Sequence, residues 1–203
     1  MRRGLLALFV IAVIAVLVAT AYIFWPRPGG APAAAKPIPL PDFVRGVPAV
    51  ITVRSSAFSN GSEIPRRYTC DGDNISPQIW IEGVPRNAKS LVLIVYDPDA
   101  PRGTFYHWLL YSIPPTTREI PEGAGRKGVP NIGVGVQGRN DFGYLGYGGP
   151  CPPPGKPHRY VFLVVALDSE PTIPPGAGPS QVMNACKGHV IGYGVLVGLY
   201  GRG

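Results

Sequence analysis

The apolar positions of this chain fall into short runs that are separated by turn residues, mainly Gly and Pro. The runs have the length of β-strands and are rich in Val, Ile, Leu and Tyr. Leu91–Tyr96 and Val161–Leu167 are apolar on both faces, so we expect them to be central strands buried on both sides. The strands that this pattern predicts are Ala49–Val53, Gln78–Ile81, Leu91–Tyr96, His107–Ile113, Tyr160–Leu167 and Gly194–Tyr200.

Helical signals are sparse, and strands do not alternate with helices of about 10–15 residues as a βαβ fold requires. The one helix candidate is Ser180–Lys187, with Ser180 as its N-terminal cap and Gly188 as its end. Gly (27) and Pro (25) together make up about a quarter of the 203 residues, which suits many short strands joined by turns. We therefore expect an all-β domain with one short C-terminal helix.

The first 26 residues are dominated by an uncharged apolar segment, Leu5–Trp25. A helix of this length would span about 30 Å, the thickness of the hydrocarbon core of a bilayer. Arg2 and Arg3 precede the segment and Trp25 ends it, which predicts a cytoplasmic N-terminus and a domain outside the cell. Residues 1–26 are thus interpreted as a single-pass transmembrane helix that anchors the protein in the cell membrane.

A cleaved signal peptide is the alternative interpretation of this segment. Ala19-Thr20-Ala21 resembles a cleavage site, and the domain would then be secreted. Residues 27–48 are rich in Pro, Ala and Gly and lack apolar periodicity, so we interpret them as a semi-extended tether. Residues 49–203 then form one domain, which is what a chain of this length accommodates.

Charge and cysteine content limit the kinds of site to expect. The net charge is +7, but Arg2, Arg3, Arg27 and Lys36 precede residue 45, and no basic run interleaved with aromatic residues marks a nucleic-acid surface. The three cysteines form no CxxC pair and no His lies at zinc-finger spacing, so neither a metal site nor a cofactor is expected. In an exported domain, one disulfide could form and one thiol would remain.

Three polar clusters at the ends of predicted strands are candidates for a site. Asp97–Pro101 follows the strand Leu91–Tyr96, and its prolines take the chain out of the sheet. Asp97 and Asp99 are two residues apart, so their side chains would face the same way if this segment stays extended. His107 opens the next predicted strand. Each feature taken alone also fits a plain turn or a structural histidine.

The third cluster consists of a Gly/Pro loop, residues 148–154, and the strand entrance that follows it. The loop has few free N–H donors and would form a rigid wall. His158 and Tyr160 lie on one face of the strand, whereas Arg159 points to the other face. Imidazolium and hydroxyl groups are suitable donors to phosphate or carboxylate oxygens, and a nearby carboxylate favours the charged imidazole. Together the three clusters predict a small anion-binding pocket.

An enzyme is the alternative use of the same residues, because His and Asp can act as the acid–base pair of a small hydrolase. No GxSxG elbow, HExxH motif or other activated nucleophile accompanies them in the sequence. A purely structural surface protein with a closed pocket is a third alternative. We therefore expect a binding module rather than an enzyme.

The motifs around these clusters resemble those of the phosphatidylethanolamine-binding protein (PEBP) family, also called Raf kinase inhibitor-like proteins, in its bacterial and archaeal branch. They occur in the family order and cover roughly residues 50–200. DPDAP combined with GPCPP and HRY is a specific signature, whereas either part alone would be weak. The matching segments are Tyr68–Pro77, Asp97–Pro101, His107-Trp108, Asn140–Gly143, Gly146–Pro153 and His158–Tyr160.

The resemblance implies an antiparallel β-sandwich with Greek-key connections and a pocket at one end that accepts phosphate, phosphoryl headgroups or similar anions. It also implies a cis peptide bond within Asp97–Pro101. It brings Cys70 near Cys151, which makes this pair the favoured disulfide, while Arg159 faces away from the pocket and is assigned a structural ion pair. The implied ligand-binding residues are Asp97, Asp99, His107, Pro150, His158 and Tyr160.

The resemblance also suggests partners. Members of the family act as inhibitors or regulators of kinases or proteases, or bind lipid headgroups. A domain outside the cell meets no cytoplasmic kinase, so we expect a small anionic ligand and a protein target such as a protease. The N-terminal helix would contact the membrane, and no nucleic-acid partner is expected.

Overall fold

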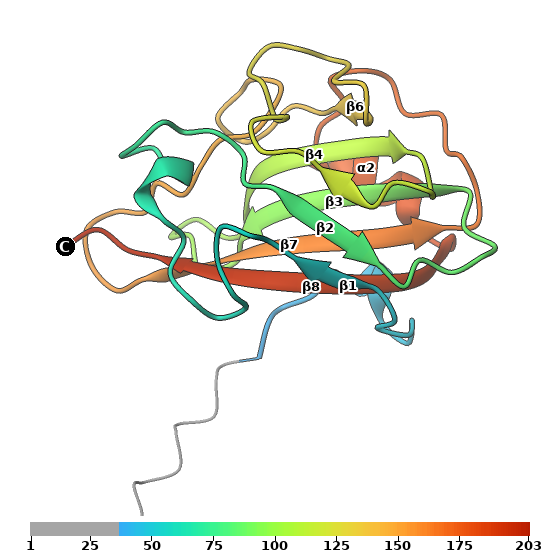
Figure 1. Cartoon of the computed structure of the whole chain (residues 1–203), viewed down its shortest axis with the longest axis horizontal. Coiled ribbons are helices and arrows are strands. Elements are labelled where there is room, and N and C mark those ends of the chain that lie inside the picture. Colours follow the sequence, from blue (N-terminus) through green and yellow to red (C-terminus); the bar gives the residue numbers. More distant parts are fainter. Residues whose placement is uncertain (1–36) are drawn as a thin grey trace, which may run out of the picture. The chain divides into compact units, whose positions relative to one another are not determined.

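Residues 37–203 are described by a computed structural model of the chain (Figure 1). The predicted membrane helix, residues 1–26, and most of the predicted tether lie outside the described residues. No helix within residues 37–203 combines the length and apolar character that a membrane span requires. The anchor therefore stays a prediction from sequence.

The larger sheet has five antiparallel strands in the order β6-β4-β3-β7-β8. Strand β3 (Ser90–Asp97) lies at its centre, between β4 (Phe105–Ile113) and β7 (His158–Leu167). The long strand β8 (Val190–Tyr200) pairs with β7 along its whole length, and the two-residue strand β6 (Val136–Gln137) flanks β4. Each of the predicted strands in this sheet is confirmed, with ends shifted by a few residues.

The smaller sheet has three antiparallel strands in the order β1-β2-β5. These are β1 (Thr52–Arg54), β2 (Ile79–Glu82) and β5 (Glu119–Ile120), and Figure 1 shows them in front of the larger sheet. The chain thus crosses to this sheet for β5 after β4 and returns to the larger sheet with β6. Strands β5 and β6 escaped prediction because two residues are too few to show a period of two.

A hydrophobic core fills the space between the two sheets. Alternate residues of β3 face it, among them Leu91, Leu93 and Val95, and they meet Ile79 and Ile81 of β2. Trp108 and Phe162, from the neighbouring strands, are fully buried in the same core. This alternation is what a two-layer sandwich requires of strands whose side chains point to opposite faces, so the predicted β-sandwich is confirmed.

The outer face of the larger sheet is covered as well. Helix α2 (Pro179–Cys186) packs there through Val182 and Cys186, and residues 38–44 pack beside it. These residues include the short 3-10 helix η1 (Asp42–Val44). This second core explains why every residue of β3 is buried, as the sequence pattern predicted.

The compact unit of the domain begins at Ile38. The boundary predicted at residue 49 therefore falls inside it, and the end of the predicted tether belongs to the fold. Val44 is buried, and Ile38, Leu40 and Phe43 pack against the outer core. The stretch looked like a tether because its backbone is irregular apart from the three residues of η1, so its apolar residues follow no regular spacing.

Two local expectations need correction. The helix starts at Pro179 rather than Ser180, and its cap is Gly178, whose amide donates to the Gln181 side chain. Proline suits this first position because its missing N–H would have no partner there. The cis peptide bond expected within Asp97–Pro101 is wrong, since residues 37–203 contain none.

Candidate functional site

A cavity of about 220 Å³ opens at the end of the larger sheet where β3 ends and β4 and β7 begin. Two loops complete it, the segment that follows β3 and the Gly/Pro loop before β7. Four of the predicted site residues meet there from three strands. The lining residues are Asp97, Ala100, Pro101, Phe105, His107, Phe142, Cys151, Pro152, Pro153, His158 and Tyr160.

Asp97 and His158 form a buried pair on one side of the cavity. His158 Nδ1 lies 2.7 Å from Asp97 Oδ2, and Asp97 Oδ1 accepts a 2.7 Å hydrogen bond from the amide of Asp99. Both carboxylate oxygens are thus used, and the carboxylate cannot move without breaking the turn. Because a carboxylate only accepts, Nδ1 of His158 carries the proton and Nε2 is the atom left for a ligand.

His107 lies opposite this pair and is also fixed at one ring nitrogen. Its Nδ1 lies 2.7 Å from the carbonyl oxygen of Gly148, so Nδ1–H donates and Nε2 is again the free position. Burial lowers the pKa of His107, and the Gly148 carbonyl and the charge of Asp97 oppose this shift only in part. The ring is therefore neutral at neutral pH unless an anion approaches it.

The hydroxyl of Tyr160 is an unsatisfied polar group at this cavity. Only 1% of the residue is exposed, and its hydroxyl makes no hydrogen bond within the part of the chain that the structure describes. The amide of Cys151 lies close enough to favour its ionised form, but burial outweighs this and raises the pKa of Tyr160. The hydroxyl therefore stays protonated and is a donor without an acceptor, which costs about 1–3 kcal/mol in a buried setting.

The wall beside Tyr160 is tied to a distant loop by a disulfide. Cys70 and Cys151 are bonded, with their Cα atoms 5.4 Å apart, which confirms the favoured pairing. Cys186 is the remaining thiol and is buried. The loops that carry Cys70 and Cys151 can approach each other because residue 149 is Gly. A Cβ atom at this position would lie 2.4 Å from the carbonyl oxygen of Tyr68, which is too close for any side chain.

Two predicted site residues, Asp99 and Pro150, do not line the cavity. Asp99 instead accepts two hydrogen bonds from the guanidinium of Arg159, at 2.7 and 2.6 Å, which confirms the structural ion pair assigned to Arg159. Asp97 and Asp99 were expected to face the same way only if the segment stays extended, and this condition is not met because the segment turns. Pro150 contributes its carbonyl oxygen, which accepts from the amide of Cys70 at 3.0 Å.

Two aromatic residues of the cavity were missed from sequence, Phe105 and Phe142. Their rings contact each other edge-on at 4.8 Å between centroids, and both contact the ring of His107. Phe105 could have been found, because it precedes His107 by two residues and so shares its face of β4. Phe142 lies within a segment that the family resemblance had marked, but nothing in the local pattern shows where its ring goes.

Comparison with known proteins decides the family. The profile of the family described as phosphatidylethanolamine-binding protein matches residues 54–201, a span that contains all four polar residues of the cavity. The chain belongs to this family. Among its relatives, a UPF0098 protein of Pyrococcus horikoshii is 53% identical over 150 residues, covering 73% of this chain and 75% of the relative. A UPF0098 protein of Aquifex aeolicus is 50% identical over 156 residues, covering 76% and 90%.

Solved structures of PEBP relatives share the fold. YbcL of Escherichia coli, described as a member of the mammalian PEBP family, superposes with a TM-score of 0.71 at 36% identity. A PEBP homologue from Chlamydia trachomatis gives a TM-score of 0.69 at 40% identity. This chain is covered to 76% in both cases, and the two relatives to 100% and 99%. The aligned part of this chain thus spans nearly the whole length of both relatives.

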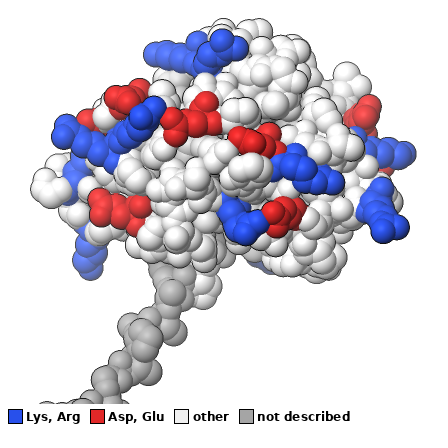
Figure 2. All heavy atoms as spheres, in the orientation of Figure 1, with Lys and Arg blue, Asp and Glu red and all other residues white. Residues whose placement is uncertain are grey.

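Charge around the PEBP domain is mixed in sign. Figure 2 shows basic and acidic side chains interspersed over the face that carries the smaller sheet. Several of them pair with one another, such as Arg67 with Glu122 at 2.8 Å. Within residues 37–203, no group of three His, Cys, Asp or Glu side chains is arranged to hold a metal ion. The polar chemistry of the cavity therefore comes from imidazole, carboxylate and phenol groups.

Proposed function

We propose that this domain is a binding module whose cavity holds one phosphoryl or carboxylate group of a ligand. The observation that carries the proposal is the buried hydroxyl of Tyr160, a donor at the cavity that has no acceptor within residues 37–203. Buried polar groups are nearly always hydrogen-bonded in folded proteins, so an exception at a cavity points to a missing partner. That partner must be an acceptor.

The rings of His107 and His158 supply the other donors of the proposed site. Each ring has its Nδ1 engaged by an oxygen of the protein, so each offers Nε2 to the ligand. When protonated, both present an N–H, and charge-assisted hydrogen bonds of this kind are the stronger ones. The negative charge of Asp97 favours the protonated form of His107. An anion and a proton should therefore bind together.

The aromatic walls favour a compact anion. Phe105 and Phe142 reduce the access of water to the imidazoles, which strengthens electrostatic attraction inside the cavity. A volume of about 220 Å³ has room for a phosphoryl or carboxylate group with a short substituent. The name of the family refers to such a group, the phosphodiester of phosphatidylethanolamine.

We further propose that the captured anion belongs either to a lipid headgroup or to a protein target that the domain inhibits or regulates. If the N-terminal segment holds the domain outside the cell, an extracellular protease is a more suitable target than a cytoplasmic kinase. An anionic group of that target would enter the cavity, and the surrounding loops would contact the rest of its surface.

A small hydrolase is the second candidate, and the Asp97–His158 pair is the observation that favours it. A carboxylate that orients an imidazole is the usual arrangement of a general base. However, the residues that line the cavity include no Ser, Thr or Lys, and Cys151 is bonded to Cys70. The nucleophile would then have to be water or one of the imidazole, carboxylate and phenol groups of the cavity. Turnover of phosphoesters by the purified protein, lost in Asp97→Asn, would favour this candidate over binding alone.

Titration of the full chain with inorganic phosphate and phosphoethanolamine, followed by calorimetry, tests the binding proposal. His107→Gln and His158→Gln should each lower the affinity by about tenfold or more, the loss expected for one charge-assisted hydrogen bond. His189→Gln is the matched control, because this third histidine lies at the opposite end of the larger sheet and pairs with Asp168. Parent-like phosphate binding by both cavity variants would refute the proposed site.

A further inference from the structure

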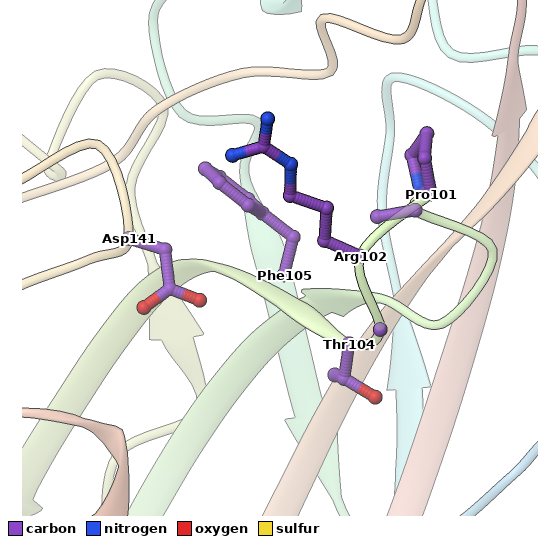
Figure 3. Close-up of a pocket in the computed structure, with 7 residues that line it drawn as sticks. Pro101, Arg102, Thr104, Phe105 and Asp141 are labelled. Atoms are coloured by element: carbon purple, nitrogen blue, oxygen red, sulfur yellow. The ribbon is translucent and has the colours of Figure 1, made fainter.

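A second hollow adjoins the anion cavity. It has a volume of about 480 Å³ and lies over the loop that joins β3 to β4. Ala100, Pro101 and Phe105 line both spaces, so a ligand held in the cavity can extend into the hollow without leaving the protein surface. Its other lining residues are Arg102, Gly103, Thr104 and Asp141 (Figure 3).

Arg102 contributes a cation to the hollow. The side chain is exposed and makes no hydrogen bond or ion pair with any residue in the range 37–203. In Figure 3 its guanidinium group lies beside the Phe105 ring. A planar guanidinium in this position can bind a carboxylate with two parallel hydrogen bonds.

Asp141 contributes an anion on the other side of the same ring (Figure 3). Its Oδ2 accepts a 2.8 Å hydrogen bond from the amide of Tyr106, and its own amide donates to the carbonyl of Tyr106 at 2.9 Å. These two bonds fix the carboxylate against β4 and leave Oδ1 for a ligand. Among the ion pairs of residues 37–203 there is none between Asp141 and Arg102, although both line the hollow.

Phe105 separates the two charges and also forms the boundary with the anion cavity. Its ring contacts the rings of His107 at 5.1 Å and Phe142 at 4.8 Å between centroids. The ring is therefore held in place by residues of the anion cavity. A ligand whose phosphoryl group lies beside His107 would carry its next few atoms past Phe105, between the exposed cation of Arg102 and the carboxylate of Asp141, which β4 holds in place.

We propose that this hollow is a subsite for an α-amino-carboxylate group, and that the complete site prefers O-phosphoserine groups to phosphoethanolamine. The inference rests on the proposed anion cavity and extends it to the rest of the ligand. Arg102 binds the carboxylate, Asp141 binds the ammonium group, and Phe105 excludes water between them. Phosphoethanolamine has the ammonium group alone, so it cannot use Arg102. The O-phosphoserine group occurs as the free amino acid and as a lipid headgroup.

Calorimetric titration of the full chain with four probes tests this subsite. The probes are inorganic phosphate, phosphoethanolamine, O-phospho-L-serine and glycerophospho-L-serine. O-phospho-L-serine should bind about tenfold more tightly than phosphoethanolamine, the gain expected for one charge-assisted pair. Arg102→Gln should reduce this ratio to about twofold or less while phosphate affinity stays unchanged. Arg86→Gln is the matched control, since Arg86 is also exposed and precedes the far end of β3.

The outcomes separate the subsite from the cavity on which it rests. If phosphate binds but both serine and ethanolamine esters bind alike in parent and Arg102→Gln, the subsite is refuted and the anion cavity stands. If inorganic phosphate itself does not bind, the cavity is refuted and the subsite falls with it. A preference for glycerophospho-L-serine identifies the lipid headgroup as the source, and a preference for the monoester identifies the free amino acid. Both of these support the subsite.

Discussion

The imidazole of His158 is oriented by Asp97, whose Oδ2 lies 2.7 Å from Nδ1 of the ring. The same carboxylate closes the turn after β3 by accepting the amide of Asp99 through Oδ1. One buried side chain thus sets both the shape of the loop and the direction in which His158 presents Nε2. A change in the turn after β3 would therefore also change the orientation of the His158 ring, because Asp97 is bonded to both.

Asp97→Ala should lower both stability and anion affinity. Removing the carboxylate leaves the Asp99 amide and the His158 Nδ1 without their acceptor in a buried setting, at a cost of about 2 kcal/mol. Asp97→Asn keeps an acceptor for the amide and should lose less. Urea unfolding of parent and both variants measures the difference. Equal unfolding midpoints for parent and Asp97→Ala would contradict the role assigned to this carboxylate.

Tyr160→Phe should separate stability from binding. The hydroxyl has no partner among the described residues, so deleting it should leave the free protein equally stable or more stable, by up to about 1 kcal/mol. The same change should weaken phosphate binding by about tenfold, because one donor is lost. Thermal unfolding and calorimetry on one preparation provide both values. A clear loss of stability in this variant would show that the hydroxyl has a partner in the free protein.

Anion affinity should fall as pH rises. Burial holds the pKa of His107 below the usual value of about 6.5, so the ring must take up a proton when an anion binds to Nε2. Sulfate is a suitable probe because its own charge does not change between about pH 5 and pH 8. Its affinity should be several-fold higher at about pH 5.5 than at about pH 7.5. A constant affinity over this range would argue against an imidazolium donor.

The lowered pKa of His107 also affects the stability of the free protein, which should rise with pH, whereas the anion affinity should fall. A histidine whose pKa is lower in the folded state binds fewer protons there than in the unfolded chain. Its stabilising contribution is complete above about pH 6.5 and is lost as pH falls toward the folded pKa. His107→Gln should remove this part of the pH dependence, which unfolding curves at about pH 5.5 and pH 7.5 would reveal. An identical dependence in parent and variant would place the titrating group elsewhere.

Reduction of the Cys70–Cys151 disulfide should loosen the wall of the cavity. The bond closes a loop between residues 81 positions apart, and its loss should cost about 4 kcal/mol. Phosphate affinity should fall at the same time, because Cys151, Pro152 and Pro153 line the cavity. Chemical unfolding with and without a reductant measures the effect. The double variant Cys70→Ala/Cys151→Ala is the control and should not respond to the reductant.

Asp99 should prove structural. Asp99→Asn disrupts the paired hydrogen bonds with Arg159, where both side chains are mostly buried, and should cost about 2 kcal/mol. Phosphate affinity should stay within about twofold of the parent, since Asp99 does not line the cavity. Calorimetry together with urea unfolding tests this separation. A large loss of affinity without loss of stability would return Asp99 to the ligand site.

The sequence by itself determined the strand framework and the direction of side chains along each strand. Continuous apolar runs identified β3 and β7 as strands buried on both faces, because both the inner core and the outer cover need apolar contacts. Because side chains alternate along a strand, the sequence placed His158 and Tyr160 on one face of β7 and Arg159 on the other face. In the structure His158 and Tyr160 line the cavity, and Arg159 pairs with Asp99. The resemblance to the PEBP family paired Cys70 with Cys151.

Only the tertiary structure decided which loops meet and where a turn sends its side chains. The turn after β3 directs Asp99 to Arg159 and not to the cavity, and no periodicity extends through a turn. Residues 38–44 cover the outer face of the larger sheet, and Phe142 contacts His107. Both segments reach these positions through mostly irregular backbone. The unsatisfied hydroxyl of Tyr160 is a property of its whole surroundings. Local pattern fixes direction within an element, whereas contacts between distant segments depend on how all the elements pack.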